Sequence, residues 1–277
     1  MDTPLVTLII PHYRTLELAQ LCLRSIRAYT QNVPFEALVI DNGSGEGPAL
    51  DYLRSVEWIR LIERTENIGI KQKAHKEAVD MAIAESRAPY VLAMHTDTIP
   101  IREDWLSWHV QKLESDDKLA AIGTDRLKLR PIWQEVLRQV EDWRFWKKAR
   151  HRRVDPYVRS HCALYRKSAL QELGLCYDDP QNDVAGRSIV LGLEANGYKT
   201  ELLSVPEVLK RVVHLDHGTM VTLPELGARA RTIRRGQRRI TKFLNQPSVD
   251  NIWKDESLDH GTLEETSATQ SAYRAAG

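Results

Sequence analysis

Short apolar runs alternate with amphipathic stretches along the first half of the chain. Each run is four or five residues long and predicts a buried strand; the runs are residues 6–10, 37–40, 58–62 and 90–94. Over 15–29 the apolar residues recur at three- and four-residue steps, which predicts a helix, and 71–86 is a second helical segment. This alternation predicts a mostly parallel sheet with helices on both faces.

Polar clusters follow three of these predicted strands. They are Pro11–Arg14, Asp41–Ser44 and His95–Thr98. Because ligands of such sheets bind beyond the carboxyl ends of the strands, we expect the three clusters to meet at one rim and form a site.

The second half has a less regular pattern. It predicts helices over 103–113, 167–173 and 184–196 and strands over 119–123 and 162–165, with a last apolar stretch ending at Val212–His214. Residues 126–153 are basic and contain Trp133, Trp143 and Trp146, which suits either a ligand-binding platform or lid or a packed amphipathic helix. Residues 229–242 carry seven basic residues and no acid, and the acidic segment after Phe243 is expected to be loosely ordered.

Composition limits the class of protein. The 277 residues carry 39 Lys and Arg against 38 Asp and Glu, a net charge of +1 that argues against a protein built around nucleic-acid binding. No run approaches the ~20 apolar residues of a membrane span, and the start lacks a signal-peptide pattern. Three cysteines without metal-type spacing suit a reducing compartment. We therefore expect a cytoplasmic protein, with contact at the inner face of a membrane left open.

The order of the motifs resembles one enzyme family. The first strand ends in Pro11 with Tyr13 and Arg14, the second in Asp41-Asn42-Gly43-Ser44, and Asn67-x-Gly69 follows. Later motifs are Ala74–Ala78, His95-Thr96-Asp97, Cys162–Lys167, Asn182-Asp183, Gly197-Tyr198 and His214. Together, over roughly residues 5–218, they resemble the inverting GT-A glycosyltransferases of family 2, which include rhamnosyl- and other bacterial polysaccharide transferases.

The resemblance implies a GT-A fold: a Rossmann-like, mostly parallel sheet flanked by helices. We expect this domain over 1–222 and a basic helix with an acidic tail over 223–277. The implied activity is transfer of a sugar from a UDP-, dTDP- or GDP-linked donor to a hydroxyl of a glycan or lipid-linked glycan. The implied cofactor is Mg²⁺ or Mn²⁺, because a hard ion stabilises the charge that grows on the departing diphosphate.

The resemblance also assigns roles to individual residues. Asp97, at the second acidic position of the Asp-x-Asp motif, and His214, at the late His position, would bind the metal, although a turn and an interior histidine are the plain alternatives. Asp41 would accept the ring N–H of the donor base, beside an Asx-type turn of its own. The other residues of the expected donor site are Pro11, Tyr13, Arg14, Asn42, Asn67, Lys71, His95 and Thr96; surface roles are equally open for Arg14 and Lys71.

Two positions depart from the family pattern. His95 stands where an Asp is usual, and its imidazole could meet ribose, phosphate or the ion itself. Asn182 replaces the Glu of a Glu-Asp pair whose Asp is Asp183. Asp183 is the expected catalytic base, with Asp178 and Asp179 as the fallback bases and an ordinary helix N-terminus as the structural alternative.

These departures keep other functions open. One is a non-catalytic glycan- or nucleotide-binding module on the same scaffold. Another is a nucleotidyltransferase, but residues 11–15 contain no glycine for a phosphate loop, which also argues against a dinucleotide-dependent dehydrogenase. Residues 229–242 could lie on anionic lipid, or could neutralise the acidic tail.

Overall fold

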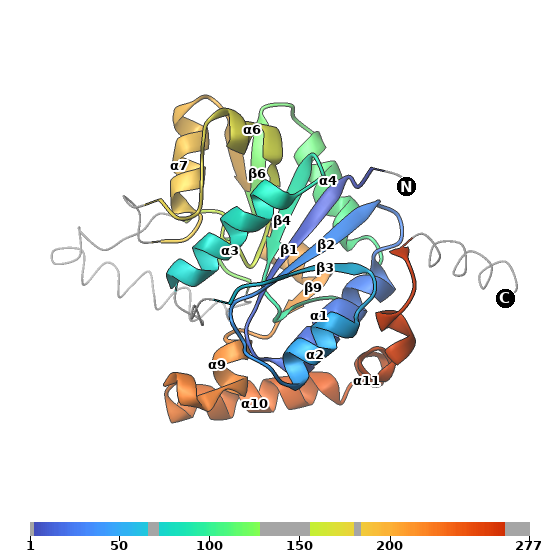
Figure 1. Ribbon diagram of the computed structural model, residues 1–277. Coiled ribbons are helices and arrows are strands. Elements are labelled where there is room, and N and C mark those ends of the chain that lie inside the picture. The colour runs from blue at the N-terminus through green and yellow to red at the C-terminus, as the bar shows by residue number, and fades with distance from the viewer. Residues whose placement is uncertain (1–2, 66–71, 128–155, 180–183, 264–277) are drawn as a thin grey trace, which may run out of the picture.

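A seven-stranded sheet forms the centre of the molecule (Figure 1). The computed structural model describes residues 3–65, 72–127, 156–179 and 184–263. Within them the strand order is β3-β2-β1-β4-β7-β6-β8. The strands are β1 (Val6–His12), β2 (Phe35–Asp41), β3 (Ile59–Glu63), β4 (Tyr90–Met94), β6 (Leu119–Gly123), β7 (Cys162–Arg166) and β8 (Lys199–Leu202).

All strands of this sheet except β7 run in the same direction. Neighbours pair in parallel from β3 to β4 and between β6 and β8, whereas β7 is antiparallel to both β4 and β6. The predicted mostly parallel GT-A sheet is therefore confirmed, with one reversed strand inside it. The reversal matters for the site, because the N-terminal end of β7 lies at the rim where its neighbours have their carboxyl ends.

The strands bury both faces, and successive residues alternate between two cores. In β1, Leu8 and Ile10 belong to one core and Ile9 to the other. The first core is covered by α1 (Leu16–Tyr29), α2 (Pro48–Ser55) and α4 (Trp105–Glu114), and the second by α3 (Gln72–Glu85), α6 (Lys167–Glu172) and α7 (Arg187–Ala195). Burial on both faces explains why these strands are continuous apolar runs in the sequence.

The boundaries differ from the sequence prediction mainly at strand ends and in short elements. β1 continues through Pro11 to His12. Beyond Ile9 this strand pairs only with β2, so the missing N–H of Pro11 does not interrupt its pairing with β4. The hydrophobic pattern did not predict α2, α8 (Val205–Leu209), α9 (Gly218–Thr222) or the three-residue strand β5 (Thr98–Pro100). Such short segments carry too few residues to show a period.

A small second sheet pairs β5 with β9 (Val212–His214) in antiparallel fashion. Thr98 lies opposite His214, and the Leu215 N–H donates to the Asp97 carbonyl at 2.8 Å. This register joins the segment after β4 to a segment more than a hundred residues later. It places residues 97 and 214 side by side.

The C-terminal segment packs back onto the first helices. After the short helix η1 (Pro224–Leu226) come α10 (Ala230–Leu244), α11 (Pro247–Lys254) and η2 (Glu256–Asp259), and α11 and η2 contact α1. Residues 247–259 are therefore ordered helices, which differs from the loosely ordered tail expected after Phe243. The division at 222 and 223 stays a prediction. No helix among the described residues is long and apolar enough to cross a bilayer.

One buried ion pair explains why this segment is ordered. Asp259 is 5% exposed and accepts hydrogen bonds from Arg24 Nε at 3.1 Å and from the Tyr52 hydroxyl at 2.8 Å. Trp58 Nε1 adds a hydrogen bond to the Leu258 carbonyl at 2.8 Å. Acidic Asp259 is thus held by a cation from α1 and a hydroxyl from α2, which no local pattern in the acidic tail reveals.

We predict that Asp259→Ala lowers the free energy of unfolding by about 3–5 kcal/mol, because Arg24 is left buried and uncompensated. Urea denaturation followed by circular dichroism measures this loss. The control is Lys254→Ala, which removes the exposed pair with Asp250 at 2.8 Å and should cost less than about 1 kcal/mol. Equal stability of the two variants would show that the Arg24–Asp259 pair does not hold the C-terminal segment.

Candidate functional site

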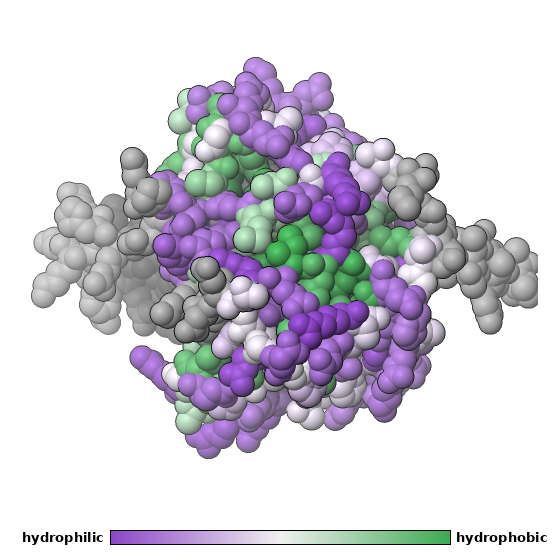
Figure 2. All heavy atoms as spheres, viewed as in Figure 1, coloured by the Kyte–Doolittle hydropathy of each residue, from purple (hydrophilic) through white to green (hydrophobic). Residues whose placement is uncertain are grey.

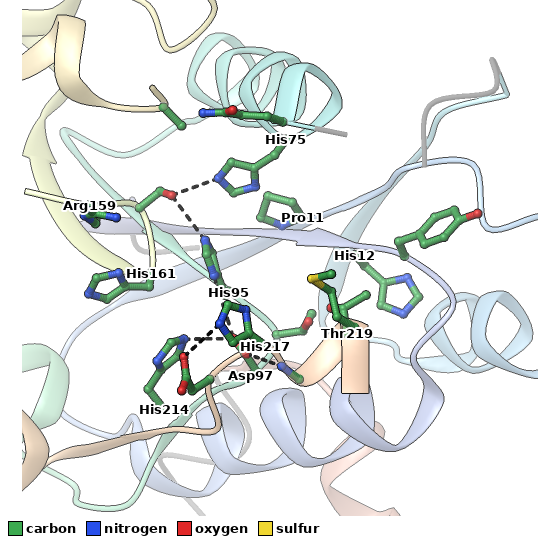
Figure 3. Close-up of a pocket in the computed structure, with 18 of the residues that line it drawn as sticks. Pro11, His12, His75, His95, Asp97, Arg159, His161, His214, His217 and Thr219 are labelled. Atoms are coloured by element: carbon green, nitrogen blue, oxygen red, sulfur yellow. Dashed lines mark hydrogen bonds and ion pairs between the residues drawn. The ribbon is translucent and has the colours of Figure 1, made fainter. Parts of the chain in front are cut away.

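A cleft of about 500 Å³ opens at the carboxyl ends of the parallel strands. The segments that follow β1, β2 and β4 line it, as do the residues that precede β7 and the turn after β9 (Figure 3). Six histidines of the described residues line this cleft: His12, His75, His95, His161, His214 and His217. The expected meeting of the strand-end clusters at one rim is thus what the structure shows for Pro11–Tyr13, Asn42 and His95–Asp97.

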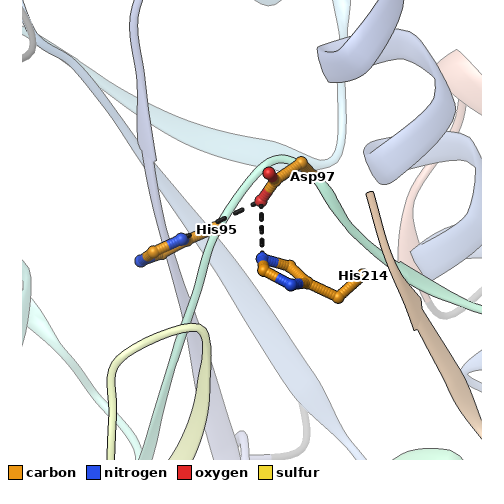
Figure 4. A group of neighbouring side chains, drawn as sticks. All are labelled: His95, Asp97 and His214. Carbon is orange, nitrogen blue, oxygen red and sulfur yellow. Dashed lines mark ion pairs between the residues drawn. The ribbon is translucent and has the colours of Figure 1, made fainter. Parts of the chain in front are cut away.

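Three side chains on the cleft wall point toward one another: His95, Asp97 and His214 (Figure 4). His214 Nε2 lies 3.3 Å from Asp97 Oδ1, and His95 Nδ1 lies 3.9 Å from the same oxygen. One ligand atom from each residue lies within 4.8 Å of the other two. Asp97 is buried, whereas the His95 side chain is 39% exposed to the cleft.

The turn after β9 holds the Asp97 carboxylate in place. Asp97 Oδ2 accepts the Gly218 N–H at 2.8 Å, at the start of α9. The two residues before it, Asp216 and His217, adopt left-handed φ angles of 53° and 66°, which turn the chain so that this N–H meets the carboxylate. A Cβ on Gly218 would lie 2.6 Å from the Asp97 Cβ and 2.9 Å from Leu18 Cδ1. Only glycine permits this close approach.

Charge interactions within the group keep the carboxylate ionised. Burial by itself raises the pKa of Asp97, but His214, His95 and the Gly218 N–H together hold it below its ordinary value. Burial also opposes the charged form of His214, yet Asp97 raises the pKa of that histidine above its usual range. Each group therefore stabilises the charged form of the other.

The three residues fit a divalent metal ion. Asp97 Oδ1 is buried and receives no hydrogen bond from the described residues, so one anionic oxygen is left for a cation. An ionised carboxylate with two imidazoles is a donor set that binds first-row divalent metals. The residues present thus match the metal that the sequence resemblance implied, with Asp97 and His214 as the predicted ligands.

Further polar side chains surround the group. Ser160 Oγ lies 3.0 Å from His75 Nε2 and 3.3 Å from His95 Nε2. The ring of His161 stacks on that of His214 with 5.4 Å between centroids, and His161 Nε2 lies 2.8 Å from Thr124 Oγ1. Burial lowers the pKa of His75 to about 3 and that of His161 to about 2, so both are neutral at physiological pH.

The Asp41 carboxylate does not line the cleft. It is 1% exposed, and its oxygens accept hydrogen bonds from His12 Nδ1 at 2.9 Å and from Ser44. Burial raises the pKa of Asp41, but these hydrogen bonds outweigh burial and lower it. The Thr15 N–H donates to His12 Nε2 at 3.2 Å, so Nδ1 carries the ring proton. Direct acceptance of the base N–H by Asp41 was expected; instead, both of its oxygens are engaged and His12 faces the cleft.

The other predicted donor residues divide into three groups. Pro11, Tyr13, Asn42, His95 and Thr96 line the cleft. Arg14 does not: its side chain is half-exposed, stacks near Tyr13 and lies 3.9 Å from Glu225. Asn67 and Lys71 lie outside the described residues, as does Asp183, the predicted catalytic base. The fallback bases Asp178 and Asp179 do not line the cleft.

Several cleft residues were not identified from the sequence: His12, His75, Arg159, Ser160, His161 and Gly218. His12 stands inside the predicted Pro11–Arg14 cluster and could have been named there. Ser160 and His161 precede a predicted strand, a position that lies at the rim only because β7 is antiparallel. His75 lies in the first turn of α3. In a sheet of this kind, helices begin at the rim formed by the carboxyl ends of the strands, so this histidine reaches the cleft.

Comparison with known proteins identifies the family. The model of the family "Glycosyl transferase family 2" matches residues 7–174, more than half of the chain. The chain therefore belongs to glycosyl transferase family 2, as the order of its motifs indicated.

Individual relatives are distant. The mannosyltransferase PcManGT from Pyrobaculum calidifontis, solved with GDP-Man and Mn²⁺, is 23% identical, with a TM-score of 0.55 over 99% of this chain and 74% of that one; it shows the shared fold. TarS of S. aureus (residues 1–349) is 13% identical, with a TM-score of 0.49 over 90% of this chain and 69% of that one. Uncharacterized protein y4gI of Sinorhizobium fredii is 30% identical over 109 residues, which are 38% of this chain and only 11% of that protein.

We predict that Gly218→Ala displaces the Asp97 carboxylate. The added methyl group would overlap Asp97 and Leu18, so the free energy of unfolding should fall by about 1–3 kcal/mol and Mn²⁺ affinity by at least about tenfold. Thermal denaturation and calorimetric titration with Mn²⁺ measure the two effects.

The matched control is Gly192→Ala in α7, where the new Cβ meets the Leu175 side chain instead. That variant should lose stability alone and bind Mn²⁺ as the wild type does. If Gly218→Ala keeps full Mn²⁺ affinity, the Gly218 contact does not position Asp97.

Proposed function

We propose that the chain transfers a sugar from a nucleoside diphosphate donor to a hydroxyl of a glycan or glycolipid, with a divalent metal ion and with inversion at the anomeric carbon. The observation that supports this most is the ion pair of Asp97 with His214, 3.3 Å apart on the wall of the strand-end cleft. A turn residue and an interior histidine alone would not place one carboxylate and two imidazoles within 4.8 Å of one another on a cleft wall.

The cleft has room and chemistry for such a donor. Its volume of about 500 Å³ lies in the range of small-molecule sites. Pro11, His12, Tyr13 and Asn42 form the part nearest β1 and β2, where we place the nucleoside. Asp97 and His214 would hold the ion beside the diphosphate. When bound, a divalent ion supplies positive charge that stabilises the departing diphosphate.

One structural neighbour supports a sugar nucleotide as the donor. PcManGT was solved with GDP-Man and Mn²⁺ and shares the fold over nearly this whole chain. We propose a hexosyl or deoxyhexosyl group on a UDP, dTDP or GDP carrier, and Mg²⁺ or Mn²⁺ as the ion. Imidazoles and one carboxylate leave the site less anionic than two carboxylates would.

Asp183 is the proposed base. The acceptor oxygen attacks the anomeric carbon from the side opposite the diphosphate, its proton passes to the Asp183 carboxylate, and the bond from the sugar to the diphosphate breaks. Asp183 lies outside the described residues, but Val184, the next residue along the chain, lines the cleft. Attack from that side yields a product of inverted configuration.

We predict that Asp97→Asn lowers turnover at least about a hundredfold, since the variant loses charge in the group that would bind the ion. It should also abolish the Mn²⁺-dependent thermal stabilisation by nucleoside diphosphates. Asp51→Asn, an exposed carboxylate on α2, is the control and should behave as the wild type. Nucleotide stabilisation that survives in Asp97→Asn would contradict the proposed metal-dependent donor site.

Asp183→Ala should reduce turnover by about a hundredfold or more and leave donor affinity unchanged, because a base acts on the acceptor proton. Turnover with a panel of sugar nucleotides and calorimetric donor binding test the two statements. Full activity in Asp183→Ala, with loss in Asp178→Asn or Asp179→Asn, would move the base to a fallback residue. Glycan binding without any nucleotide binding would instead favour the non-catalytic module.

A cationic stripe on α10 suggests where the acceptor resides. Arg231, Arg234, Arg235, Arg238 and Lys242 are all exposed. At 3.6 residues per turn they span about 100° of the helix circumference. The opposite side, with Ile233, Ile240 and Phe243, faces the protein. Figure 2 shows a largely hydrophilic surface along this lower edge of the molecule.

The acidic tail does not neutralise this stripe within the described residues. Asp250 pairs with Lys254, and Asp259 pairs with Arg24, so these acids are engaged elsewhere. Among the described ion pairs none involves the five cations of the stripe. We therefore propose that α10 lies on an anionic bilayer at the cytoplasmic face, and that the acceptor is carried on a lipid.

The stripe is also linked to the site. Gly236 of α10 packs against Val221 of α9, and Arg239 donates to the Asp216 carbonyl at 2.6 Å. α9 begins with Gly218, whose N–H holds Asp97. A membrane bound along α10 would thus lie near the turn that forms one wall of the cleft.

We predict that the protein sediments with vesicles of phosphatidylcholine and phosphatidylglycerol but not with phosphatidylcholine alone. Replacement of Arg234, Arg235 and Arg238 by Glu should weaken binding by more than about a hundredfold, because each lost basic residue costs about 1 kcal/mol and each new carboxylate is repelled by the anionic lipid. The control replaces the exposed Arg87, Lys112 and Lys118 by Glu, the same change in charge on other surfaces. Equal loss in both variants would show that net charge, and not α10, governs binding.

A further inference from the structure

His95 occupies the position at which its family pattern has an acidic residue, and the structure shows what the imidazole faces. Its Nδ1 lies 3.9 Å from Asp97 Oδ1, the same oxygen that His214 Nε2 approaches at 3.3 Å. Two atoms bound to one ion at about 2.1 Å are about 3–3.5 Å apart when adjacent. The ligand atoms of the three residues lie within 4.8 Å of one another, so a shift of the His95 ring toward both partners would complete a three-residue ligand set.

The second ring nitrogen of His95 is also accounted for. Its Nε2 lies 3.3 Å from Ser160 Oγ, and this hydroxyl also lies 3.0 Å from His75 Nε2. When Ser160 donates to His75 and accepts from His95, the His95 proton resides on Nε2 and the Nδ1 lone pair faces Asp97. A ligating histidine typically donates its other N–H in this way, which fixes the ring and its tautomer.

We propose that His95 is the third metal ligand, through Nδ1, and that Ser160 and His75 are positioning residues for it. The proposal rests on the proposed function only for the place of the ion beside the donor. The donor set is one carboxylate and two imidazoles, with a single negative charge. Imidazole suits first-row transition metals, whereas Mg²⁺ requires oxygen ligands. The site should therefore select Mn²⁺ and Co²⁺ over Mg²⁺.

The neighbouring side chains reinforce this selection. His161 stacks on His214 and is itself fixed by Thr124, so the second imidazole is also held in place. The three-residue group contains one carboxylate, that of Asp97, and two imidazoles. Asp216, the other acid that lines the cleft, is engaged with Arg239 at 3.4 Å. Selectivity should thus depend on residue 95 in particular.

The test is calorimetric titration of the donor-free protein with Co²⁺, Mn²⁺ and Mg²⁺. His95→Asp restores an oxygen ligand, so the ratio of Co²⁺ to Mg²⁺ affinity should fall at least tenfold, by weaker Co²⁺ and tighter Mg²⁺ binding. His95→Ala should lower the affinity for Co²⁺ at least tenfold and leave the affinity for Mg²⁺ nearly unchanged. Ser160→Ala should lower the affinity for Co²⁺ by less than His95→Ala does. The absorption spectrum of Co²⁺ bound to Ser160→Ala should shift toward that of Co²⁺ bound to His95→Ala.

His260→Ala is the matched control, an exposed histidine beside Glu57 that does not line the cleft. It should leave all three affinities unchanged. An affinity ratio that is the same in wild type, His95→Asp and His95→Ala, each shown to be folded by circular dichroism, would overturn the proposal. The outcome is separate from transfer itself: a protein with His95-dependent Co²⁺ binding and no nucleotide binding would keep this inference and lose the proposed function.

Discussion

The antiparallel pairing of β5 with β9 is the constraint on which the site depends. These strands have three residues each, yet their register sets Thr98 opposite His214 and so places Asp97 beside that imidazole. A slip of one residue would turn His214 to the opposite face and separate the pair. The Leu215 N–H to the Asp97 carbonyl and the Gly218 N–H to its carboxylate lock this register from the following turn. Two short strands thereby unite segments more than a hundred residues apart.

The elements after β9 extend this constraint through the rest of the molecule. The turn at Asp216 and His217 leads into α9, α10 packs on α9, and α11 and η2 return to α1. Asp259 of this C-terminal segment binds Arg24 of α1. The same helix carries Leu18, which lies beside Gly218. The C-terminal helices are thus part of the support of the cleft. A surface contact made by α10 acts on the same structure that positions the Asp97 carboxylate.

The sequence predicted the sheet well because its strands are buried on both faces, and Tyr90–Met94 was predicted to the residue. The family motifs located Asp97 and His214, whose proximity the structure shows. Tertiary contacts decided the rest. Ser160 and His161 reach the rim because β7 is reversed, and the order of residues 247–259 follows from Arg24, far away in the chain. Asp41 was placed at the correct strand end, but only coordinates show that His12 and Ser44 engage its oxygens.

We propose that Asp97 and His214 hold one ion beside the diphosphate of a sugar nucleotide, with His95 completing the group. Anomalous diffraction from crystals grown with Mn²⁺ and a nucleoside diphosphate would locate this ion. We expect one manganese peak within coordination distance of Asp97 Oδ1, His214 Nε2 and His95 Nδ1, in contact with the diphosphate. A nucleotide bound in the cleft with no manganese at these residues would contradict this proposal.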